Sequence, residues 1–135
     1  MRSAVHVPSL AALALSSVLG IVGCGGGDDG ADVGLSPVAA EGRRISTDSG
    51  CAGCHGADGQ GGLGPAWTGL YNSTVTLEDA STVVADDAYL QRAITDPAAE
   101  KVAGFTVAMQ ENELSAEDVE AVVAYIRELA AAEPG

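Results

Sequence analysis

Residues 51–55 read Cys-Ala-Gly-Cys-His, and this run constrains the chain more than any other feature. Two thiols three positions apart, followed at once by an imidazole, are what covalent haem attachment needs. Cys51 and Cys54 would bond to the two vinyl groups of one porphyrin edge, and His55 would bind the iron. The run therefore predicts one covalently attached haem c.

The first residues predict an export signal that is not part of the folded domain. A basic start is followed by an apolar stretch over residues 10–19, which is too short to span a bilayer comfortably. It ends in Ile-Val-Gly-Cys at 21–24, which resembles the signal of bacterial lipoproteins and implies lipidation of Cys24. An ordinary signal peptide with an unpaired cysteine is the alternative. We expect a signal peptide over 1–23 and a lipid anchor that holds the protein at the periplasmic or extracytoplasmic face of a membrane in the cell envelope.

Residues 24–35 are rich in glycine and aspartate and lack apolar periodicity, so we expect a flexible tether there. The folded domain is then expected over 36–132. After cleavage, five basic residues oppose 19 acidic ones, which leaves a formal charge of −14. This charge argues against a nucleic-acid partner. It either steers a basic redox protein or serves solubility alone.

The first helix is expected to begin after Ser36, a capping residue, with Pro37 in its first position and Thr47 near its end. Gly50 then leads into a loop that carries the Cys-Ala-Gly-Cys-His run. Five of the nine residues over 56–64 are glycine, which continues the loop.

Two short β-branched runs, 74–77 and 82–84, predict a small hairpin. Thr76 and Asp79 also imitate a capping box, so a helix that begins at Thr76 is the alternative.

Two further helices are expected. Asp86 or its neighbour caps one that ends at Asp96 before Pro97. Ser115 and Asp118 form the capping box of the last helix. Apolar residues recur at helical spacing in both helices, namely Tyr89, Leu90, Ala93 and Ile94 in the first, and Val119, Val122, Val123, Ile126 and Leu129 in the second.

A haem that transfers electrons without binding a substrate needs a second axial ligand. Once the signal is removed, His55 is the only histidine and Met109 the only methionine. A buried methionine usually fills gaps in a core. Lys101 is the other candidate, but its ammonium would first have to lose its proton.

Two other interpretations of the thiols fit less well. A redox Cys-x-x-Cys of the thioredoxin kind expects a preceding strand and a βαβ context, which the sequence lacks. A zinc site needs four ligands, whereas Cys51, Cys54 and His55 supply three.

From about residue 41 to 130 the chain resembles the monohaem class I cytochrome c domain, and specifically the version fused to subunit II of haem-copper oxidases of the caa3 type. The resemblance rests on Gly50 to Gly56, Gly64 to Tyr71, the hairpin from Thr74 to Val84, Asp87 to Pro97, Val102 to Phe105, Met109, and Leu114 to Ile126. It implies an all-α class I cytochrome c fold, with about three to four helices around one haem and a small β-hairpin.

The resemblance also implies roles for individual residues. Cys51 and Cys54 would carry the haem, and His55 and Met109 would be the axial ligands. The backbone carbonyl of Pro65 would accept a hydrogen bond from the histidine ring nitrogen that does not bind iron. Taken alone, this proline predicts only a turn.

Three departures from the family pattern stand out. Gln110 follows Met109 where the family usually has proline, which leaves the loop less rigid. The expected turn over 78–81 lacks the usual glycine. No membrane helices or dinuclear copper domain precede the haem domain, so we expect a stand-alone lipoprotein.

The expected function is single-electron transfer in a bacterial respiratory chain, between membrane complexes such as a quinol-oxidising complex and a terminal oxidase. We expect an electron-transfer protein, not an enzyme, with no small-molecule substrate. The alternatives are a haem enzyme or gas sensor with an open distal site, and a non-catalytic cytochrome subunit of a larger membrane complex.

Overall fold

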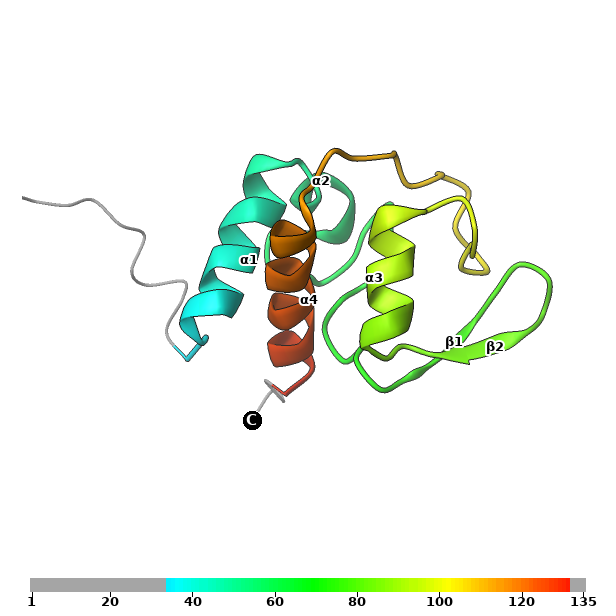
Figure 1. Ribbon diagram of the computed structural model, residues 1–135. Coiled ribbons are helices and arrows are strands. Elements are labelled where there is room, and N and C mark those ends of the chain that lie inside the picture. The colour runs from blue at the N-terminus through cyan, green and yellow to red at the C-terminus, as the bar shows by residue number, and fades with distance from the viewer. Residues whose placement is uncertain (1–33, 132–135) are drawn as a thin grey trace, which may run out of the picture.

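The computed structural model describes residues 34–131, with side chains as far as Leu129. In this part the elements run α1 (Pro37–Asp48), α2 (Ala52–His55), β1 (Thr74–Thr76), β2 (Thr82–Val84), α3 (Asp87–Thr95) and α4 (Ala116–Ala131) (Figure 1). Four helices and one two-stranded sheet agree with the all-α expectation. The predicted signal and nearly all of the predicted tether lie outside the described residues.

The first helix begins as the sequence predicted. Ser36 is its N-cap, and its hydroxyl accepts a hydrogen bond from the Ala39 N–H. The backbone N–H and the hydroxyl of Ser36 also donate to the Glu128 carboxylate, at 2.8 and 2.5 Å. The start of α1 is therefore tied to the last full turns of α4.

Helices α1 and α4 pack side by side (Figure 1). Their close approach depends on Gly42, because a Cβ atom at that position would collide with the backbone carbonyl of Ala121. Alanine is the better helix former by roughly 1 kcal/mol. The glycine therefore favours close helix contact at some cost in helix propensity.

The predicted hairpin is confirmed, and the alternative helix from Thr76 is wrong. Strands β1 and β2 are antiparallel, with Thr74 paired to Val84 and Thr76 to Thr82. The turn between them places Ala80 at a φ of 67°, in the left-handed region that glycine usually occupies. This is the turn in which the sequence lacks the expected glycine.

Both later helices also have the predicted caps. The Asp86 carboxylate accepts from the Tyr89 N–H at 2.8 Å, and α3 ends at Thr95, just before Asp96. At the start of α4, Ser115 N–H donates to the Asp118 carboxylate at 3.0 Å, and Asp118 N–H donates to the Ser115 hydroxyl at 3.2 Å. This reciprocal pair is a capping box.

The hydrophobic core lies where α1, α3 and α4 meet the hairpin and the Trp67 segment. Its buried members include Ile45, Trp67, Val75, Leu77, Tyr89, Leu90, Ile94, Val119, Val122, Val123, Tyr125 and Ile126. The predicted apolar stripe of α4 is buried as far as Ile126, and Leu129 is half-buried beside it.

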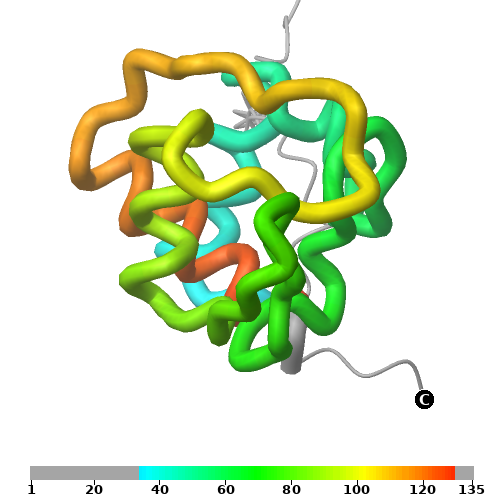
Figure 2. Tube along the Cα trace, turned by 90° about the vertical axis from the view of Figure 1, so that its right-hand side faces the viewer, coloured from blue at the N-terminus to red at the C-terminus, as the bar shows by residue number. Residues whose placement is uncertain are grey.

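The segment between α3 and α4 crosses the end of the molecule that carries α2, as Figures 1 and 2 show in yellow and orange. The first turn of α1 and the last turn of α4 lie at the opposite end (Figure 1). Among the described residues, no helix is both long and apolar enough to cross a membrane.

Candidate functional site

The Cys51 to His55 run forms a single helical turn, where the sequence had predicted a loop. The N–H groups of Cys54 and His55 both donate to the Cys51 carbonyl, at 3.1 and 3.0 Å. Gly56, with a φ of 86°, ends the turn. Because Cys51 and Cys54 are three residues apart on a helical turn, they share one face of it.

The loop after this turn folds back onto it. Gly61 N–H donates to the His55 carbonyl at 2.7 Å, and Gly64 N–H donates to the Cys54 carbonyl at 3.0 Å. These bonds bring the Pro65 carbonyl within hydrogen-bond distance of the histidine ring.

His55 is held by its Nδ1 atom, which lies 2.7 Å from the Pro65 carbonyl oxygen. This is the contact that the resemblance implied. Because a carbonyl can only accept, Nδ1 carries the proton and Nε2 keeps its lone pair. Burial lowers the pKa of His55, and the Pro65 bond opposes this only in part. The imidazole is therefore neutral at pH 7, the form in which Nε2 can bind a metal.

The histidine ring is also held by an aromatic contact. Trp67 stacks on it with ring centroids 4.6 Å apart, and the Tyr125 ring lies nearly perpendicular to that of Trp67, with centroids 6.1 Å apart. A Cβ atom at Gly64 would lie 2.9 Å from Cε1 of His55, so only glycine fits there without a shift. The sequence reasoning missed both Trp67 and Gly64 as site residues, although both lie in the Gly64 to Tyr71 motif that supported the resemblance.

The two thiols do not resemble a redox pair. Cys51 and Cys54 are both free and half-buried. Burial raises the pKa of the Cys51 thiol, whereas a reactive dithiol needs a lowered one. A helix also precedes the pair, not a strand.

Met109 lies outside the core, with 39% of its surface exposed. The interpretation of this residue as a core filler is therefore wrong. It sits in the irregular segment between α3 and α4.

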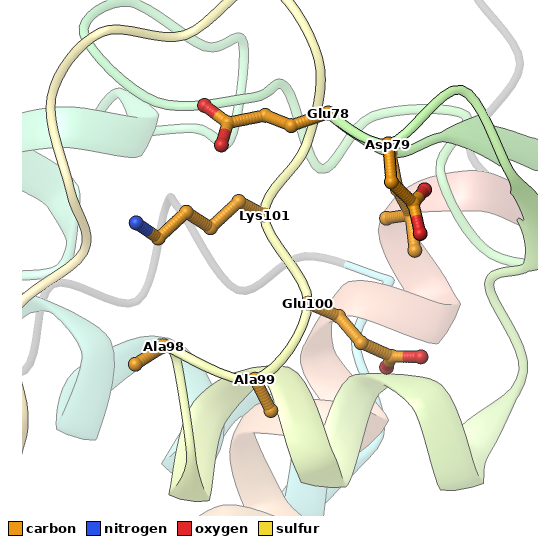
Figure 3. Close-up of a pocket in the computed structure, with 7 residues that line it drawn as sticks. Glu78, Asp79, Ala98, Ala99, Glu100 and Lys101 are labelled. Atoms are coloured by element: carbon orange, nitrogen blue, oxygen red, sulfur yellow. The ribbon is translucent and has the colours of Figure 1, made fainter.

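Lys101, the other candidate for the second ligand, lies at a pocket that is separate from the Cys51 to His55 turn. It lines a pocket of about 190 Å³ together with Leu77, Glu78, Asp79, Ala98, Ala99 and Glu100. In this pocket Glu78 and Lys101 extend in the same direction, whereas Glu100 extends in the opposite one (Figure 3). No residue of the Cys51 to His55 turn contributes to it.

The residues around the turn fit a covalently bound haem. Two unpaired thiols share one face of the turn, and a neutral imidazole has its Nδ1 fixed and its Nε2 without a hydrogen-bond partner among residues 34–131. Covalent attachment of haem uses two cysteine thiols and a neighbouring histidine of this kind. Within the same residues, no group of three or more histidine, cysteine, aspartate or glutamate side chains is placed to hold a metal ion.

Comparison with known protein families matches residues 39–130 to the family described as Cytochrome c. No curated protein matches the chain. Domains of this family bind haem c covalently, one haem to a single domain, and are typically electron-transfer proteins. Since the match covers about two thirds of the sequence and agrees with the fold, the chain belongs to the cytochrome c family.

Proposed function

We propose that this protein is a lipid-anchored, single-electron carrier of a bacterial respiratory chain, a stand-alone relative of the cytochrome domain of caa3-type oxidases. The haem supplies one-electron chemistry at its iron. The observation that carries the proposal is the 2.7 Å contact between His55 Nδ1 and the Pro65 carbonyl, because it prepares one imidazole nitrogen for iron.

The residues of the chain have distinct roles in this proposal. Cys51 and Cys54 would hold the cofactor by thioether bonds, and His55 would bind its iron. Pro65 fixes the orientation of the imidazole and raises its basicity. Met109 would be the second ligand of the iron, and its exposure outside the core supports this role.

The proposed partners are redox proteins with basic docking surfaces, such as a quinol-oxidising complex and a terminal oxidase. The formal charge of −14 on the chain from residue 24 onward supports this choice. All four arginines between residues 34 and 131 form ion pairs with nearby carboxylates. The remaining acidic side chains, which outnumber these pairs, therefore keep their negative charge uncompensated.

The anchor is proposed at Cys24, after removal of residues 1–23. Mass spectrometry of the protein extracted from membranes should find the Cys24 thiol lipidated. An unmodified Cys24 in that fraction would disprove the anchor and leave the haem site unaffected.

The second ligand is tested by visible spectroscopy of the oxidised holoprotein. We expect a sulfur-to-iron charge-transfer band that Met109→Ala abolishes. A wild-type protein that is high-spin and binds cyanide at once would instead support the alternative function, a haem enzyme or gas sensor with an open distal site. Co-purification with a larger complex in mild detergent would support a subunit role.

A further inference from the structure

We propose that Asn112 is a positioning residue for Met109. It holds in place the segment around Met109, which lacks the stiffening proline that the family usually has directly after the methionine. This inference rests on the proposed role of Met109 as an axial ligand. It concerns the stretch 104–111, here called the methionine strap, which joins the hairpin side of the molecule to the start of α4.

The strap is fixed at its N-terminal end by the hairpin. Glu78 N–H donates to the Lys101 carbonyl, and Ala103 N–H donates to the Thr76 carbonyl, each at 2.9 Å. Leu77 and Val102 form an isolated antiparallel bridge between these two bonds. Residues 101–103 are thus hydrogen-bonded to the end of β1 and to the two residues that follow it.

Between its ends the strap has little internal support. The side-chain amide of Gln110 donates to the Ala108 carbonyl at 3.3 Å, a long local bond that reaches no other element. Only Phe105 is half-buried, and residues 106–111 are exposed. The position of Met109 therefore depends on the two ends of the strap.

The C-terminal end is fixed by one side chain. Asn112 Nδ2 donates to the Ile94 carbonyl at 2.7 Å, and its Oδ1 accepts from the Leu114 N–H at 3.2 Å. Ile94 lies in the last turn of α3, where carbonyls lack partners within the helix, while its side chain is part of the core. Asn112 therefore links the strap to a rigid element and directs the chain into α4.

The two hydrogen bonds call for an amide in particular. Alanine would lose both. Aspartate would keep the acceptor for Leu114 but would place a carboxylate against the Ile94 carbonyl, where two acceptors repel each other. With either change, the strap should carry Met109 out of its ligating position more often.

The test is the rate at which imidazole binds to the oxidised holoprotein, measured beside the sulfur-to-iron charge-transfer band. Asn112→Ala and Asn112→Asp should each raise the rate about tenfold and weaken the band. Amide hydrogen exchange should show lost protection at Leu114 in Asn112→Ala, whereas Asn112→Asp keeps the acceptor and the protection. Asn112 is exposed, so neither change disturbs the core.

Thr95→Ala is the matched control. The Thr95 hydroxyl donates to the Gln91 carbonyl at 2.9 Å at the same helix end, so this hydrogen bond stays within α3 and does not involve the strap. Its removal should leave imidazole binding unchanged. If the Asn112 variants behave like Thr95→Ala while the wild type shows the band, the positioning role is overturned. A wild type without the band would overturn the Met109 assignment and the inference with it.

Discussion

At the scale of single residues, the site is organised around one imidazole. Pro65 sets the tautomer of His55, Trp67 covers one face of the ring, and Gly64 leaves room for it. Two of these contacts involve a backbone carbonyl and a missing Cβ atom. The site therefore depends on how the 56–67 loop folds back as much as on the chemistry of its side chains.

Gly64→Ala tests this dependence. The new methyl group would lie 2.9 to 3.3 Å from three atoms of the His55 ring, so the ring or the loop must shift. We expect a loss of about 1–3 kcal/mol in the free energy of unfolding, measured by denaturant titration of the holoprotein, together with a weaker Pro65 contact. Gly53→Ala is the control, because a Cβ atom there meets nothing within 4 Å. Equal losses in both variants would contradict the steric argument.

At the scale of elements, the caps and the hairpin were predictable because each has a short, local signal in the sequence. The helical turn at Cys51 was not, since four residues are too few to show a period. The hydrogen bond from Asn112 to α3 was not predictable either. Its partner Ile94 lies 18 residues away, and no local pattern indicates a contact between a loop side chain and the end of another helix.

The capping box of α4 predicts a pH effect. The Ser115 hydroxyl, and then its N–H, lower the pKa of Asp118 below its ordinary value of 3.8. A carboxyl with a lowered pKa in the folded state stabilises that state above the unfolded pKa, and this contribution is lost as the pH falls through the folded value.

We therefore expect Asp118→Asn to lower the thermal midpoint at pH 7, where the carboxylate also favours the helix N-terminus. The gap between wild type and variant should close as the pH falls from about 4 towards 2. Circular dichroism melts of both holoproteins across this range would measure it. An unchanged gap at the acid end would show that the carboxylate charge is not its source.

At the scale of the whole molecule, the main property of the surface is its excess of negative charge. The four arginines of the described part are engaged locally, and among these residues no ion pair engages the ammonium of Lys101. The field that an approaching partner meets is therefore dominated by carboxylates.

This field predicts opposite salt effects for two small redox reagents. Oxidation of the reduced protein by a cationic cobalt complex should slow about tenfold between low and high ionic strength, whereas oxidation by ferricyanide should accelerate. Stopped-flow rates at constant pH would measure both. Rates that change in the same direction for both reagents would mean that the net charge does not govern approach to the haem.

The contact between α1 and α4 has a consequence for how the chain folds. These helices come from opposite ends of the domain, so their pairing closes a loop of some 80 residues, at an entropic cost on the order of 4 kcal/mol. Long-range closure of this kind is slow compared with the formation of a local turn. During synthesis, the chain would stay open until its final helix emerges, and the Cys51 to His55 turn would be accessible throughout that interval.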